Sequence, residues 1–235
     1  KTVNRPLANP GLTRAGFWLL LLTGGWGGLA QLPSVPAWIP AVSGAANVLV
    51  VVPMLALVTC LWQTADGKVA EAWKASAPFR FLLVAAVILL GINLRTAILG
   101  GHAMQFTFFA TARTDIVLLG AFGLAALGAL HYVVPRLTTG EDELPSAGLA
   151  DLAFWAALLG VLGVGIGFSL AGFTQASVNA NAAKDFLKDG SVAIAGNLKL
   201  VTAGYAGLVI AALAFLANFA LAARRCCTAC CGGAR

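Results

Sequence analysis

Long apolar stretches separated by short polar segments dominate the sequence. No charged residue occurs between Arg14 and Asp66, and the stretches 152–183 and 200–223 are also uncharged. A helix of about 20 apolar residues crosses the ~30 Å hydrocarbon core of a bilayer. Cutting the apolar stretches at charges, prolines and loop-type residues predicts six membrane-spanning helices, over residues 15–32, 40–63, 79–101, 114–137, 149–173 and 196–223.

The polar connections predict where the chain turns at the bilayer surface. Three prolines between residues 33 and 40 forbid one continuous helix, and Trp38 suits the interface. Segment 64–78 holds four charges and a tryptophan, which is typical of a short amphipathic surface segment, and segment 174–195 is long enough for a small surface helix. With no internal repeat, we expect a cytoplasmic segment 1–14, a single transmembrane domain 15–223 and a Cys-rich cytoplasmic tail 224–235.

Composition supports the same fold class, an all-α membrane bundle. Hydrophobic residues make up 60% of the 235 residues and charged residues only 10%, whereas about a quarter of a soluble domain is charged. This balance excludes disordered chains, secreted disulfide scaffolds and nucleic-acid modules. The net charge of +6 comes from charges between the apolar stretches, so it gives no nucleic-acid-binding stripe.

The distribution of lysine and arginine predicts the orientation of the chain. With both termini cytoplasmic, ten of these residues fall on the cytoplasmic side and five on the other, as positive-inside topology favours. The ten are Lys1, Arg5, Arg14, Lys68, Lys74, Arg80, Arg136, Arg224, Arg225 and Arg235; the five are Arg95, Arg113, Lys184, Lys188 and Lys199.

Glycine predicts how the helices pack. The chain has 27 glycines, and small residues let helices in lipid approach closely, where burying leucine against leucine gains little. Four-residue spacing predicts three such helix faces, at Gly24 and Gly28, at Gly163 and Gly167, and at Gly120, Leu124 and Gly128.

One stretch carries a recognisable motif pattern. Segment 105–137 begins Gln-Phe-Thr, continues through a glycine-rich helix and ends Tyr-Val-Val-Pro-Arg-Leu. It resembles the tenth transmembrane helix of haem-copper oxidase subunit I, especially in cbb-type cytochrome c oxidases and nitric oxide reductases. Shorter motifs extend the resemblance over nearly the whole chain: Pro36-x-Trp38, Phe79-Arg80-Phe81 and Gly172-x-x-Gln175. The resemblance implies that the six spans correspond to helices seven to twelve, the C-terminal half of that subunit.

The chain departs from this pattern where the family binds its cofactors. Arg113 and Asp115 stand where the family has the His-x-His pair that ligates its two haem irons. Segment 24–31, which matches the copper-binding stretch, contains neither histidine nor tyrosine. Imidazole is the ligand that these metals need. The resemblance therefore implies a family member that has lost its haem and copper ligands, and we expect no catalytic residue and no metal site.

A few polar residues at membrane depth need partners. Because buried charges in lipid are costly, we expect Arg95, Arg113 and Asp115 to form an ion-paired cluster in the space left by the haem; the alternative is that each charge reaches water separately. We expect His131 to be structural, hydrogen-bonded between helices or at the interface. His102 is the one candidate ligand to a cofactor, which would belong to a neighbouring subunit.

The cysteines give a weaker signal. Cys227-x-x-Cys230 has chelating spacing, but no second pair lies at a distance, so a closed zinc site would be cramped. We expect reduced, non-ligand cysteines in the tail, with lipid attachment and metal binding as alternatives, and a buried apolar Cys60.

These observations favour an accessory subunit that binds no cofactor itself. It would pack in a bacterial inner membrane against other subunits of a respiratory complex, and haem would be carried by partner cytochromes; we expect no nucleic-acid partner and no catalysis by the chain alone. Two alternatives stay open: one half of a split oxidase or reductase with cofactors supplied in trans, and a bundle that binds or transports a small molecule or lipid.

Overall fold

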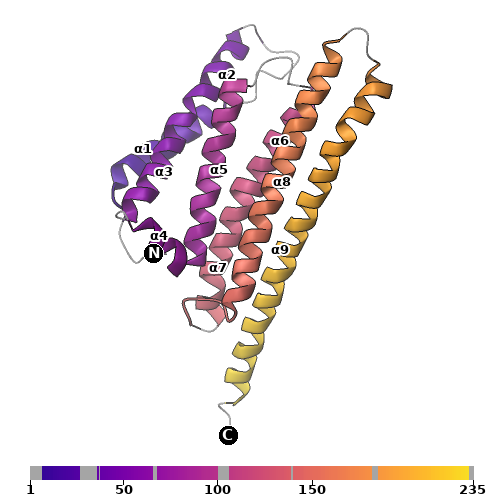
Figure 1. Cartoon of the computed structure of the whole chain (residues 1–235). Coiled ribbons are helices and arrows are strands. Elements are labelled where there is room, and N and C mark those ends of the chain that lie inside the picture. The colour runs from indigo at the N-terminus through magenta and orange to yellow at the C-terminus, as the bar shows by residue number, and fades with distance from the viewer. Residues whose placement is uncertain are drawn as a thin grey trace.

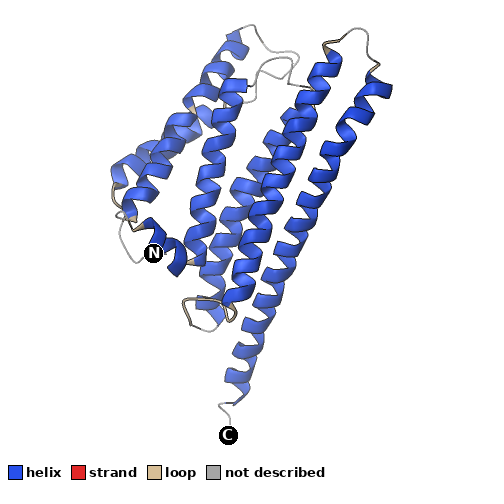
Figure 2. Ribbon diagram, in the orientation of Figure 1, coloured by secondary structure: helices blue, strands red, loops and turns tan. Residues whose placement is uncertain are grey.

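The structure is a computed structural model that describes residues 7–26, 36, 38–65, 68–99, 106–138, 140–181 and 185–232. Every regular element within these residues is helical (Figure 2), as the sequence predicts. In chain order (Figure 1) they are α1 (Pro10–Gly24), α2 (Trp38–Leu49), α3 (Val51–Thr64), α4 (Val69–Ala75), α5 (Ala77–Leu99), α6 (Phe108–Asp115), the π-helical η3 (Ile116–Gly123), α7 (Leu124–Thr138), α8 (Ala147–Asn179), the π-helical η4 (Phe186–Gly190) and α9 (Ser191–Gly232).

Five helical segments of the described chain are long and apolar enough to cross a membrane: Trp38–Thr64, Ala77–Leu99, Phe108–Thr138, Ala147–Asn179 and Lys188–Cys227. The predicted count of six is not confirmed. The missing span, 15–32, corresponds to α1, whose 15 described residues reach about 22 Å at 1.5 Å per residue, less than the ~30 Å hydrocarbon core. Residues 27–32 of that span lie outside the described residues.

Several helix ends differ from the predicted ones. α6 begins at Phe108 instead of 114, because the Thr107 hydroxyl caps it by accepting a hydrogen bond from the backbone N of Phe109 at 3.2 Å. α9 continues to Gly232, so the predicted tail prolongs the last helix; no proline interrupts this stretch. The short helix α4 lies within the segment 64–78 for which a surface location is predicted, and it buries none of its residues.

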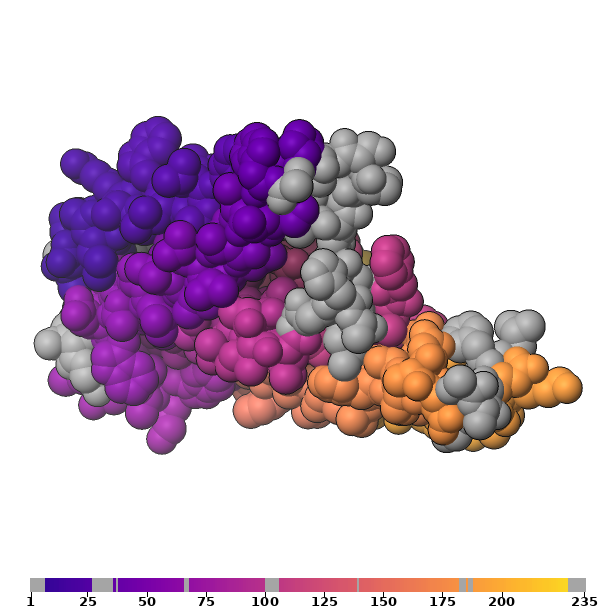
Figure 3. All heavy atoms as spheres, turned by 90° about the horizontal axis from the view of Figure 1, so that it is seen from above, coloured from indigo at the N-terminus to yellow at the C-terminus, as the bar shows by residue number. Residues whose placement is uncertain are grey.

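Neighbouring helices in the bundle follow chain order. α1 packs on α3, α3 on α5, α5 on η3 and α7, α6 on α8, and α8 on α9. Seen from above in Figure 3, α1 and the α8–α9 pair lie on opposite sides of the molecule. The main buried cluster joins α5, α7, α8 and α9 through Phe81, Leu124, Phe154, Ala157 and Ala211.

Glycines bring α8 and α9 into backbone contact. A Cβ at Gly204 would lie 2.7 Å from the carbonyl O of Gly160, and one at Gly163 would lie 3.2 Å from Gly204 Cα. A Cβ at Gly167 would lie 2.7 Å from the side chain of Val201. The predicted Gly163 and Gly167 face is therefore confirmed as the seam of the two longest helices, where close approach supplies the van der Waals contact.

The predicted face of Gly120, Leu124 and Gly128 is also confirmed, whereas the predicted face of Gly24 and Gly28 is not. A Cβ at Gly120 would lie 2.7 Å from Val161, and one at Gly128 would lie 2.8 Å from Phe81 Cβ. These contacts hold the segment from η3 to α7 against α5 and α8. At Gly24, by contrast, a Cβ would meet nothing within 4 Å, and Gly28 lies outside the described residues.

Candidate functional site

Two motifs from the sequence meet at the start of α6. The side-chain Oε1 of Gln175 accepts a hydrogen bond from the backbone N of Phe108 at 3.0 Å. One turn earlier on α8, a Cβ at Gly172 would collide with the backbone of Phe109. The glycine of the Gly-x-x-Gln motif thus lets the backbones of α6 and α8 approach closely. The glutamine of the motif accepts a hydrogen bond from a backbone N–H that the first turn of a helix leaves unpaired. This contact fixes α6, with Arg113 and Asp115, against α8.

Arg95, near the end of α5, lies over the same first turn of α6. Its Nη2 donates to the carbonyl O of Phe109 at 3.2 Å, and the guanidinium carbon sits 3.5 Å from the centre of the Phe109 ring. Its Nη1 is buried and has no hydrogen-bond partner. The ring and the carbonyl stabilise the cation, but they do not neutralise it.

Arg113 and Asp115 contact different helices. Arg113 Nη2 donates to Asn47 Oδ1 of α2 at 3.3 Å, and the hydroxyl of Tyr205 on α9 donates to Asp115 Oδ2 at 2.5 Å. Among the described residues, no ion pair within 4.0 Å joins Asp115 to Arg95 or Arg113. The structure thus gives each member of the predicted cluster a partner outside it.

Sequence reasoning missed Asn47 and Tyr205. The signal that could have found them is an uncharged polar side chain inside an apolar span, since such side chains hydrogen-bond across helices in lipid. The charged residue that each of these side chains contacts depends on how the helices are rotated about their axes. The spacing of residues in the sequence does not give that rotation.

A cavity of about 990 Å³ adjoins Arg113 and Asp115, between α1, α3, α5 and the segment from α6 to η3. Its lining is mostly apolar, with Leu20 and Met54 among the side chains, and Asn93 adds a polar side chain. This volume is at the upper end of the range for small-molecule sites.

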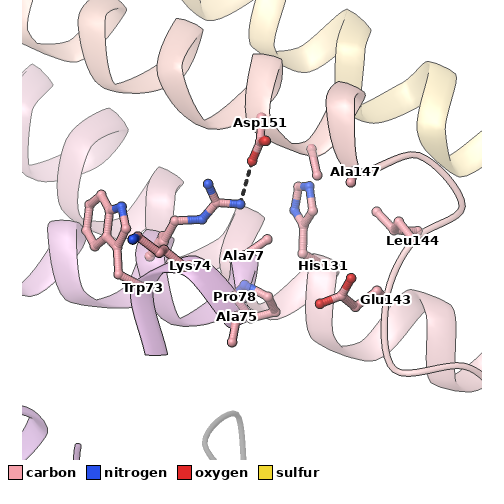
Figure 4. A pocket seen from close by; sticks show the side chains of 12 residues that line it. Trp73, Lys74, Ala75, Ala77, Pro78, His131, Glu143, Leu144, Ala147 and Asp151 are labelled. Atoms are coloured by element: carbon pink, nitrogen blue, oxygen red, sulfur yellow. Dashed lines mark ion pairs between the residues drawn. The ribbon is translucent and has the colours of Figure 1, made fainter. Parts of the chain in front are cut away.

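A second pocket, of about 380 Å³, lies at the other end of α5 (Figure 4). An ion pair crosses it: Arg80 Nη2 lies 2.6 Å from Asp151 Oδ1, and the arginine is the better buried of the two. Lys74 and Glu143 also line the pocket. The site therefore holds two cations and two anions around a small polar space.

His131 also lines this pocket, almost entirely buried. Its Nδ1 lies 2.8 Å from the carbonyl O of Leu127, one turn back on α7, and its ring lies between those of Phe81 and Phe215, 4.9 and 5.1 Å from their centres. Nε2 has no hydrogen-bond partner. Of the two alternatives expected for this histidine, the hydrogen bond between helices is wrong, because the described bond lies within its own helix; a place at the interface stays a prediction.

The remaining candidates contribute little to either site. His102 lies outside the described residues. Cys60 is buried, as predicted, and its Sγ lies 3.1 Å from the hydroxyl of Thr13 on α1. Cys227 lies exposed near the end of α9. No group of three or more His, Cys, Asp and Glu side chains in the described part of the chain could hold a metal ion.

Comparison with known proteins decides the family. The model of the family "Cytochrome C and Quinol oxidase polypeptide I" matches residues 1–206. The chain belongs to this family. No curated protein matches it significantly. As a family member the chain is a haem-copper oxidase-like membrane protein, and the resemblance carried by the sequence motifs is confirmed.

The described residues of this family member do not fit a haem iron or copper centre. Both metals take imidazole nitrogen as the typical protein ligand. His131 is the one histidine in the described part, and two phenylalanine rings flank it. Arginine, which stays protonated, has no free lone pair for a metal. We therefore derive no reaction step through either group.

Proposed function

We propose that the chain is an accessory subunit of a membrane electron-transfer complex that binds no redox cofactor itself. One observation carries this proposal: Arg113 and Asp115, which the sequence resemblance puts at the positions of the family's haem ligands, form hydrogen bonds to Asn47 and Tyr205 of other helices. Positions that hold a cofactor in other family members would then hold the bundle together. Haem would reside in partner subunits, which we expect to be cytochromes.

The outer surface supports packing against membrane partners. Along α8, large apolar side chains recur every three or four residues on an exposed face: Leu152, Trp155, Leu159, Leu162 and Ile166. Such a face suits lipid or another transmembrane helix. We further propose that both termini face the cytoplasm of a bacterial cell, from the excess of lysine and arginine on that side.

Purification in mild detergent tests the proposal. The full chain is isolated from its native membrane, its co-purifying subunits are identified by mass spectrometry, and haem is measured by absorption spectroscopy in the complex and in the separated chain. We expect cytochrome subunits and haem in the complex, and no haem in the separated chain. Stoichiometric haem on the separated chain, or a chain that purifies alone without cytochromes, overturns the proposal. Haem that is lost whenever two chains separate would indicate a split oxidase instead.

A further inference from the structure

A third cavity, of about 400 Å³, forms a groove between α5, η3 and α8. Its lining is almost wholly apolar, with Ile92, Ile116, Val161 and Ile166 among the side chains. Exposed leucines at its edge, Leu99 and Leu162, face the surroundings of the bundle. Because these helices are long and apolar enough to span a membrane, the groove opens at membrane depth, where lipid would reach it.

One cation lines this apolar groove. Among the described residues that line the groove, Arg95 is the only charged one. Its Nη1 has no hydrogen-bond partner, and no carboxylate of the described chain forms an ion pair with it. An uncompensated cation is expensive at membrane depth, so an anion from outside the chain would stabilise it.

We propose that this groove binds an anionic amphiphile, a lipid whose carboxylate or phosphate pairs with Arg95 while its acyl chain fills the groove. One charged end and an otherwise apolar lining match such a molecule in both charge and polarity. A transmembrane helix fits poorly, because one turn of helix with its side chains already takes roughly 400–600 Å³. The site is separate from the 990 Å³ cavity and does not depend on the accessory role proposed above.

Gly91 allows the groove to be blocked without disturbing the fold. It lines the groove, and a Cβ there would meet no atom within 4 Å. Gly91→Leu therefore adds a side chain to the space that the acyl chain would fill. Gly44 on α2 offers the matched control, since a Cβ there also meets nothing within 4 Å and Gly44 does not line the groove.

Binding is measured by native mass spectrometry of the delipidated full chain in a neutral detergent. The probes are oleate, phosphatidylglycerol and the zwitterionic phosphatidylcholine, each added in the same series of concentrations. We expect at least one of the two anionic probes to be retained at least tenfold better than phosphatidylcholine. Oleate alone would assign the head group to a free carboxylate, and phosphatidylglycerol alone to a lipid phosphate.

The variants decide whether this binding occurs at the groove. Arg95→Gln and Gly91→Leu should each lower retention of the anionic probe at least tenfold, Arg95→Lys should keep part of it, and Gly44→Leu and Lys199→Gln should leave it unchanged. If Arg95→Gln does not fold, Gly91→Leu carries the test. Equal retention of phosphatidylcholine, unchanged binding by Gly91→Leu, or no retention of either anionic probe overturns the proposal. A cross-link from Gly91→Cys to an acidic partner helix in the native complex, without bound lipid, does the same.

Discussion

The hydroxyl of Tyr205 on α9 donates a hydrogen bond to the carboxylate of Asp115 on α6, with 2.5 Å between the two oxygens. The two residues lie 90 positions apart in the chain. Asp115 forms no ion pair within 4.0 Å in the described part of the structure, so this bond is its stabilising contact in a largely apolar environment. Asp115 thus links the last helix to the middle of the bundle.

Replacing Tyr205 by phenylalanine tests that link. Tyr205→Phe leaves the Asp115 carboxylate without this donor, and we expect the free energy of unfolding to fall by about 1–3 kcal/mol. Adding Asp115→Asn should recover part of the loss, since a neutral amide costs less to leave unpaired. Thermal unfolding in detergent, followed by circular dichroism, gives the comparison. Tyr132→Phe makes the same chemical change at a residue that stacks under Arg136; an equal loss there would contradict the prediction.

Asn218 should contribute about as much to the free energy of unfolding as the hydrogen bond between Tyr205 and Asp115, although the sequence around it gives little sign of this. The side chain is fully buried in α9; its Oδ1 accepts from the backbone N of Ser146 at 3.0 Å, and its Nδ2 donates to the backbone O of Ser146 at 2.8 Å. We expect Asn218→Leu to cost about 2 kcal/mol of unfolding free energy, because two backbone groups lose their partner.

Ser146→Ala is the control for Asn218→Leu. It keeps both backbone bonds to Asn218 and removes only the helix cap, in which the Ser146 hydroxyl accepts from the backbone N of Leu149 at 3.3 Å. A cap of this kind contributes about 1 kcal/mol. Chemical denaturation of both variants would show the difference; a larger loss for Ser146→Ala would mean that the cap, and not the asparagine, holds this end of α8.

The sequence predicts local features of this fold well and distant pairings poorly. Apolar length predicts the five spans that the described chain contains, although not the count of six, and the four-residue spacing of Gly163 and Gly167 predicts one helix seam. Both features depend only on near neighbours in the chain. The partners of Arg113 and Asp115 lie 66 and 90 residues away. These pairings depend on the rotation and the membrane depth of each helix, which many side chains determine together. The same limit explains why the charges at membrane depth predict an ion-paired cluster, whereas the structure gives Arg95, Arg113 and Asp115 other contacts.

A bulky side chain introduced between α8 and α9 should prevent these two helices from packing closely. A Cβ at Gly204 would lie 2.6 Å from the backbone N of Val164, and backbone cannot move aside as a flexible side chain can. We expect Gly204→Leu to lower the unfolding free energy by about 3 kcal/mol or more, or to abolish folding in detergent. Gly44→Leu adds the same atoms in open space and should stay within about 0.5 kcal/mol of the parent. Size-exclusion profiles and melting curves check both; a stable Gly204→Leu chain would contradict the seam.

Two of the ion pairs in the described part of the chain should differ in strength because their side chains differ in burial. Arg80, 13% exposed, pairs with Asp151 at 2.6 Å, whereas Arg136 pairs at 2.5 Å with Asp142, which is 83% exposed. Asp151→Asn leaves a mostly buried guanidinium without its ion-pair partner, and of the described residues that line the pocket only Glu143 then carries a negative charge. We expect a loss of about 1–2 kcal/mol, less than for a fully buried pair because Asp151 itself is half-exposed.

Asp142→Asn removes a charge that water already solvates, so it should cost less than about 1 kcal/mol. Raising the salt concentration distinguishes the two ion pairs further, since salt screens exposed ion pairs more strongly than buried ones. The stability difference between parent and Asp151→Asn should persist in high salt, and the smaller difference for Asp142→Asn should disappear. If both differences vanish together, the pocket of Figure 4 is open to water, and Arg80 is as well hydrated as Arg136.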